Sequence, residues 1–117
     1  MKRPTDAERQ KWEDNGVLFL PNALEGKELT QLQTLFDRCA AEAKADWLEG
    51  ISKGTHPAAH FDIPKPLEKD DFFIDLIDHP SWYGYLMDFA DEDLILLGPQ
   101  VRTLPVLPIS YVGWHPD

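Results

Sequence analysis

The sequence contains a single cysteine, Cys39, among its 117 residues. One cysteine cannot form an internal disulfide, and it cannot supply the several thiolates of a structural zinc site. Any metal bound by this chain must therefore use nitrogen and oxygen ligands. Cys39 lies beside the apolar stripe of an expected helix, so we interpret it as a small buried residue in preference to a reactive nucleophile.

Positive charge is also scarce, because 11 Lys and Arg residues stand against 21 Asp and Glu residues, a formal net charge of −10. A surface of this sign repels a polyanion, which argues against a nucleic-acid binder. No apolar run approaches the ~20 residues needed to cross a bilayer. The N-terminus turns acidic at Asp6, where a signal peptide would become apolar. We expect a cytoplasmic protein with no membrane span.

What is present is the composition of a folded protein, with 43% hydrophobic and 27% charged residues. A chain of this length is one domain at most, and it is short for an enzyme that must enclose a cofactor and a substrate. No internal repeat, low-complexity segment or linker divides it. We expect residues 1–117 to form a single domain that is a truncated N-terminal portion of a larger domain.

Helices are predicted first along the chain. Thr5 and Glu8 have the spacing of a capping box, and Asn15-Gly16 supplies a left-handed stop. A long helix is predicted over residues 26–47, where apolar residues recur at steps of three and four. These residues are Leu29, Leu32, Leu35, Phe36, Ala40, Ala43 and Trp47.

The remaining chain alternates irregular, helical and extended patterns. Residues 50–70, rich in Gly and Pro, favour an irregular connection, and short helices are predicted over 72–77 and from Pro80 to Phe89. The apolar run Val17–Leu20 indicates a buried strand. Three further strands are predicted, at residues 93–98, 100–104 and 109–114. The chain is therefore expected to be helical first and β-rich last.

The most informative segment is Tyr111-Val112-Gly113-Trp114-His115-Pro116-Asp117. In an extended backbone the side chains of His115 and Asp117 lie on the same side, so one metal ion could contact both. An imidazole and a carboxylate are two of the three ligands of the facial triad that holds ferrous iron. By spacing alone, a chance surface pair is the alternative.

Four landmarks in order resemble proteins of the phytanoyl-CoA dioxygenase family. Residues 15–24, N-G-V-L-F-L-P-N-A-L, look like the family's opening, and a long helix follows around Glu28-Leu29 as in the family. Asp78-His79-Pro80 is similar to the x-H-P that begins the family's next helix. Residues 113–117 match the family's x-W-H-x-D metal motif. The resemblance covers the chain from about Trp12 onward.

The resemblance implies an Fe(II)- and 2-oxoglutarate-dependent dioxygenase that hydroxylates a small organic or lipid-like substrate. It implies an α+β fold, in which N-terminal helices support the first strands of an incomplete double-stranded β-helix, a jelly-roll or cupin-like barrel. His115 and Asp117 are then metal ligands. The apolar residues of the long helix are then core residues.

Gln100 and Arg102 stand ahead of the metal motif, where related hydroxylases have a similar Q-x-R with the glutamine near the co-substrate. Both side chains would share one face of an expected strand, which makes them candidate cofactor-binding residues. The alternative is a polar pair on a solvent-facing strand that needs no function.

The other histidines have simpler interpretations. His56 and His60 are four residues apart, a spacing that on a helix lets two imidazoles share a metal. Pro57 and the surrounding composition instead favour solvated loop histidines. His79 precedes Pro80 at an expected helix start, where a cap or a surface position suffices.

The family has a third iron ligand, a histidine well after H-x-D, followed by a basic residue that pairs with the far carboxylate of 2-oxoglutarate. The 117 residues contain neither, so we expect this chain by itself to hold iron poorly and to be inactive. The alternative is a non-catalytic binding or assembly module. Its exposed strands would pair in a homodimer.

Overall fold

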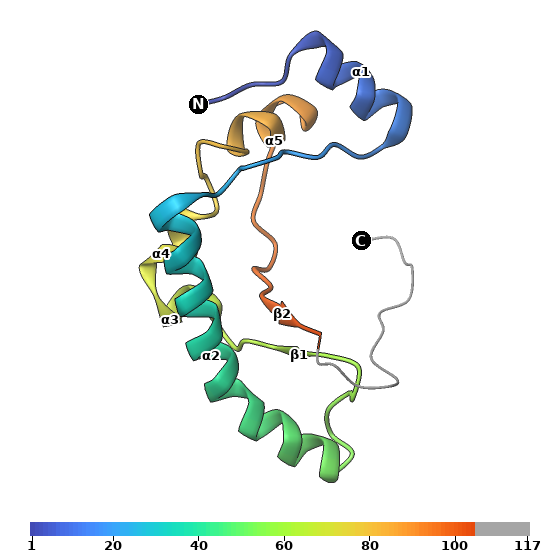
Figure 1. Ribbon diagram of the computed structural model, residues 1–117. Coiled ribbons are helices and arrows are strands. Elements are labelled where there is room, and N and C mark those ends of the chain that lie inside the picture. The colour runs from blue at the N-terminus through green and yellow to red at the C-terminus, as the bar shows by residue number, and fades with distance from the viewer. Residues whose placement is uncertain (105–117) are drawn as a thin grey trace.

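The computed structural model describes residues 1–104 (Figure 1). Its elements are α1 (Asp6–Asn15), α2 (Gly26–Ser52), β1 (Phe61–Asp62), α3 (Pro66–Lys69), α4 (Asp71–Asp75), α5 (Tyr83–Phe89) and β2 (Arg102–Thr103). Helices and an antiparallel sheet place the described part in the α+β class. The sheet of residues 1–104 has two strands, and these residues form no barrel. None of their helices is both long enough and apolar enough to span a membrane.

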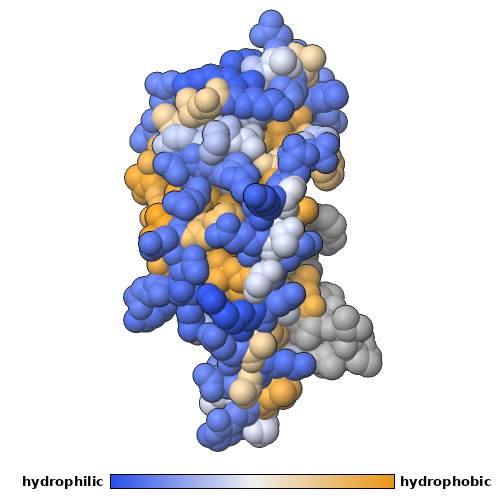
Figure 2. Space-filling model, turned by 60° about the vertical axis from the view of Figure 1, so that its left-hand side comes forward, coloured by the Kyte–Doolittle hydropathy of each residue, from blue (hydrophilic) through white to orange (hydrophobic). Residues whose placement is uncertain are grey.

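The long helix α2 is the spine of the molecule (Figure 1). Helices α1 and α5 lie together near its N-terminal end, and β1 and β2 lie beside its middle. The radius of gyration is 16.8 Å, whereas a compact domain of this length would have about 13 Å. The elements therefore form an open arrangement with much apolar surface uncovered. Figure 2 shows part of that surface, in orange, among the polar side chains on the side that carries α2.

The two predicted N-terminal helices are confirmed, because their signals are local. The Thr5 side chain accepts the backbone N–H of Glu8, the Glu8 side chain accepts that of Thr5, and Gly16 ends α1 at φ +66°. The long helix begins at Gly26 as expected and continues to Ser52, five residues beyond the predicted end at Trp47. The apolar stripe of α2 is only partly buried, because Leu35 and Trp47 are buried but Leu29 is exposed.

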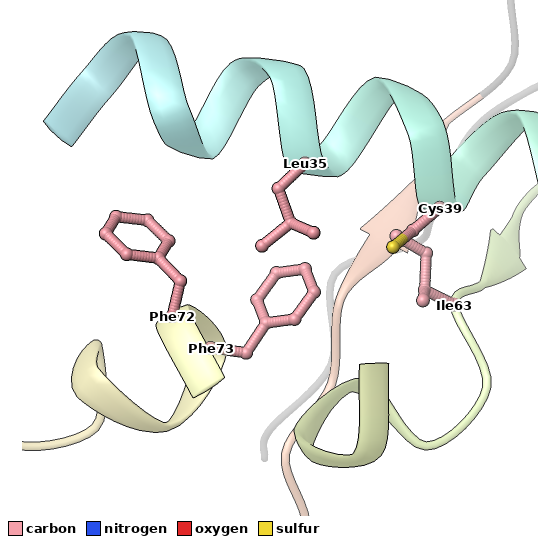
Figure 3. Close-up of a cluster of buried hydrophobic side chains, with 5 residues drawn as sticks. All are labelled: Leu35, Cys39, Ile63, Phe72 and Phe73. Carbon is pink, nitrogen blue, oxygen red and sulfur yellow. The ribbon is translucent and has the colours of Figure 1, made fainter. Parts of the chain in front are cut away.

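The main core lies between α2 and the segments that follow it (Figure 3). Its buried residues are Leu35, Cys39, Ile63, Phe72 and Phe73. Figure 3 shows Leu35 and Cys39 pointing from α2 toward the two phenylalanines of α4 and toward Ile63, which follows β1. Cys39 is 2% exposed, so its interpretation as a small buried residue is confirmed.

A second cluster joins the N-terminus to α5. Trp12 stacks on Phe89 with ring centroids 4.8 Å apart, and the Tyr85 hydroxyl donates to Glu8. Arg9 pairs with Asp88 on α5. The capping box of α1 therefore also helps to hold α5, since Glu8 takes part in both interactions.

The strand predictions are largely wrong for the described residues. Residues 17–20 and 93–98 are extended but pair with no other described strand, and β2 occupies only two residues of the predicted 100–104. A strand needs a hydrogen-bonded neighbour, and an apolar run cannot specify one. Conversely, β1 lies within the span expected to be irregular. The predicted strand 109–114 lies outside the described residues.

Two smaller helix boundaries also differ from the predictions. The helix expected to start at Pro80 starts at Tyr83, because His79 and Trp82 first form a turn closed by a bond from the Trp82 N–H to the His79 carbonyl, 3.1 Å long. The helix expected over 72–77 is α4, Asp71–Asp75, capped by the Asp70 side chain.

Candidate functional site: a carboxylate held by Gln100 and Arg102

The polar side chains at β2 converge on one carboxylate. Asp62 of β1 lies directly opposite Arg102 in the antiparallel register. The Arg102 guanidinium donates from Nε to Asp62 Oδ1 at 2.7 Å and from its terminal nitrogen to Oδ2 at 3.0 Å. The Gln100 amide donates to the same Oδ2 at 3.2 Å. Gln100 and Arg102 therefore act on the same side of the chain, as their spacing predicts.

The core holds these two strands in place. Phe61 and Ile63, on either side of Asp62, are buried against α2, which leaves the Asp62 side chain pointing the other way. The Ile63 N–H donates to the Val101 carbonyl at 2.9 Å, which extends the pairing beyond β1. Packing beneath the strands therefore sets the register that places Asp62 against Arg102.

The hydrogen bonds from Arg102 lower the pKa of the Asp62 carboxyl below its ordinary value of 3.8, with smaller contributions from its charge and from His60. The same interaction raises the pKa of Arg102. Asp62 is therefore an anion at neutral pH. The Asp62 side chain is 40% exposed and that of Arg102 is 29% exposed, so small molecules in solution can reach this group.

A groove runs beside these residues, between α2 and the segment that leads into β2. It is lined by Leu32, Gln33, Phe36, Asp37, Phe73, Leu76, Gln100, Val101 and Arg102. Most of its lining residues are apolar, and Gln33, Asp37, Gln100 and Arg102 are the polar ones. An amide and a guanidinium that together grip one carboxylate have the chemistry needed to bind a carboxylic acid. In this structure their partner is Asp62.

The predicted metal ligands, His115 and Asp117, lie outside the described residues. Within residues 1–104, no three His, Cys, Asp or Glu side chains lie close enough together to hold a metal ion. The described part therefore offers no protein-ligand set to which iron can be fitted. The donor set within these residues is that of Gln100 and Arg102, and in the structure it binds the Asp62 carboxylate.

His56 and His60 lie in the loop after α2, not on a helix. His56 is exposed, and its Nδ1 lies 3.0 Å from the Thr55 hydroxyl. His60 is half-buried in a hollow that also involves Trp47 and Asp62, and its Nδ1 has no hydrogen-bond partner among the described residues. The loop interpretation is confirmed, while His60 is less solvated than expected.

The sequence did not indicate the burial of His79. This residue is 8% exposed, stacks on Trp82 at 4.4 Å and accepts the Ser81 backbone N–H on Nδ1. Its Nε2 lies 3.4 Å from Glu28 of α2. The surface alternative is therefore wrong, because the turn before α5 folds the ring against the start of the long helix, whereas the bond from the Ser81 N–H agrees with the capping alternative.

Asp62 is the residue that sequence reasoning missed. It lies in a span whose glycines and prolines predict irregular structure, and its partner is 40 residues away. The signal that could have found it is the alternation of Phe61-Asp62-Ile63, apolar, polar, apolar, which is typical of a short half-buried strand.

No family model, no curated protein and no solved structure matches the chain. The case for any function therefore depends on the residues of this sequence and on the geometry of residues 1–104.

Proposed function

We propose that this chain belongs to an Fe(II)- and 2-oxoglutarate-dependent dioxygenase that resembles the phytanoyl-CoA dioxygenase family. The observation that carries the proposal is the ordered set of four landmarks ending in Trp114-His115-Pro116-Asp117. Each landmark is weak alone, but their order and separations together favour one protein type over a chance H-x-D pair. The proposed fold is the double-stranded β-helix, with α1 to α5 as the helical support on its outside.

Each proposed site residue has a role that follows from its chemistry. His115 and Asp117 would hold the iron through an imidazole nitrogen and a carboxylate oxygen. Bound iron and 2-oxoglutarate would supply the oxidising chemistry that hydroxylates a C–H bond. Gln100 and Arg102 would bind a carboxylate of the co-substrate, and the convergence of their donors on the Asp62 carboxylate supports that role.

The proposed substrate class is a small organic or lipid-like molecule. Support comes from the groove beside Gln100 and Arg102, which the apolar residues Leu32, Phe36 and Leu76 also line. A groove of this kind suits a ligand with a hydrocarbon body and one anionic group.

Iron binding tests the proposal directly. We expect anaerobic titration of the folded chain with Fe(II) and 2-oxoglutarate to produce a weak visible charge-transfer band, because two of the three facial-triad ligands are present in the 117 residues. The band should disappear in His115→Ala and persist in His56→Ala, the matched control on an exposed loop histidine. Failure to see any band, or its equal loss in both variants, would contradict the proposal.

A second comparison separates co-substrate binding from structural support. Asp62→Ala and Arg102→Ala both remove the ion pair between β1 and β2, but only Arg102→Ala removes a hydrogen-bond donor. We expect 2-oxoglutarate to bind Asp62→Ala at least as tightly as it binds the unchanged chain, and to bind Arg102→Ala more weakly. Equal weakening in the two variants would assign Arg102 a structural role alone.

A non-catalytic assembly module is the second candidate function. The observation that favours it is the exposure of consecutive apolar residues after α5, with Ile95 79% and Leu97 89% exposed. Surface of this kind is typical of a protein interface. The module requires a partner for this segment but no iron. The absence of the charge-transfer band would therefore not contradict the assembly function.

A further inference from the structure

Residues 94–97, Leu-Ile-Leu-Leu, form the most exposed apolar segment of the described chain. The segment is extended, and its exposed fractions alternate, at 39%, 79%, 56% and 89%. This period of two is that of a β-strand. Leu94, Ile95 and Leu96 all line a hollow with Leu86 and Phe73, but Ile95 keeps most of its surface exposed, and Leu97 lies outside that hollow.

The backbone of this segment also lacks backbone hydrogen-bond partners among residues 1–104. The N–H of Asp93 bonds to the Ala90 carbonyl, and the next backbone pairing among residues 1–104 is that of Val101 with Ile63. Between these two points, the main-chain groups of residues 94–100 make no backbone hydrogen bond to another described residue. An extended apolar segment whose main-chain groups have no partner among residues 1–104 is a template for strand addition.

The charges at its two ends select the orientation of the added strand. Residues 94–101 carry no ionisable side chain, Asp91, Glu92 and Asp93 precede them, and Arg102 follows. A parallel pairing of two copies would bring the acidic ends together. An antiparallel pairing instead brings the acidic end of each copy toward the Arg102 end of the other, which reduces repulsion in a chain of net charge −10.

We propose that residues 94–98 are the interface of a homodimer in which the segments of two copies pair antiparallel about a two-fold axis at Leu96. In this register Ile95 of one copy lies opposite Leu97 of its partner, on the same face of the paired strands. The pairing is short because Pro99 has no N–H to donate. The proposal does not depend on iron or on 2-oxoglutarate.

Light scattering and sedimentation equilibrium of the complete chain test the interface. We expect a particle of twice the chain mass of 13.4 kDa at high concentration. Ile95→Lys combined with Leu97→Lys should give a monomer, since it places like charges opposite one another on the shared face. Both side chains are mostly exposed, so the variant should keep the far-ultraviolet circular dichroism spectrum of the parent. Leu48→Lys, at a half-exposed position on α2, is the control that should remain a dimer.

Disulfide cross-linking tests the register. The buried Cys39 should not cross-link two unchanged chains under mild oxidation. Leu96→Cys should cross-link efficiently, because the two new thiols would face each other at the axis, whereas Leu48→Cys should not. A monomer at all concentrations, an open-ended aggregate, or equal cross-linking at positions 48 and 96 would overturn the proposal. None of these outcomes bears on the iron titration, so the two proposals can fail separately.

Discussion

The burial of Ile63 predicts a large and specific loss of stability on truncation. Ile63 is 2% exposed and lies between β1 and the core formed by Leu35, Cys39 and Phe73. Replacing it with Ala removes three buried carbon atoms, which costs about 2.4 kcal/mol at about 0.8 kcal/mol per methylene. The cavity that remains adds to this, so we expect Ile63→Ala to lower the free energy of unfolding by about 3 kcal/mol. Ile63→Val should cost about 1 kcal/mol.

Ile74 provides a control of the same residue type. It lies on α4 and is 44% exposed, so Ile74→Ala should cost less than about 1 kcal/mol. Urea denaturation followed by tryptophan fluorescence measures both variants, and the slope with denaturant shows whether each still unfolds as one unit. If Ile63→Ala cost no more than Ile74→Ala, the position of β1 against α2 and α4 would be wrong. The side-chain amide resonance of Gln100 should shift in Ile63→Ala alone, because Ile63 sets the register of its partner Asp62.

Three further predictions concern contacts outside this core. The lowered pKa of Asp62 means that its ion pair stabilises the fold above the ordinary pKa of 3.8 and is lost as the pH falls through the lower folded value. Asp62→Asn should therefore lower the melting temperature at pH 7, and the difference should vanish in strong acid. Trp47→Phe keeps a ring in contact with Phe61 but leaves the Pro57 carbonyl, which accepts the indole N–H at 2.7 Å, without that donor, and should cost about 1–2 kcal/mol by denaturation. In Gly84→Ala the new methyl group would meet the N-terminal backbone, so hydrogen exchange should show residues 1–4 released from α5 despite the better helix propensity of Ala.

The helices could be predicted because their signals act over short distances. The capping box of Thr5 and Glu8, the left-handed Gly16 and the three-and-four spacing along α2 each operate within a few residues. Such signals hold whatever the rest of the chain does. The burial of Cys39 followed from the same spacing.

The strands could not be predicted in the same way, because a strand is defined by its partner. Residues 17–20 and 94–97 have apolar runs of strand length, yet neither pairs with another described segment. The strands that do pair, β1 and β2, have two residues each and are held by the core beneath them. The candidate site was also predictable only in part. Gln100 and Arg102 were identifiable from their spacing, but Asp62 was not.

The sequence by itself determined the acidic character of the protein, the lack of thiolate metal chemistry, the two N-terminal helices and the H-x-D pattern of His115 and Asp117. Each of these depends on composition or on residues close together in the chain. Only the tertiary structure decided that Asp62 meets Gln100 and Arg102, that His79 is buried, and that Ile95 and Leu97 are left open. These outcomes depend on which distant segments α2 brings together, and the free energy that selects them comes from a core that no local pattern specifies.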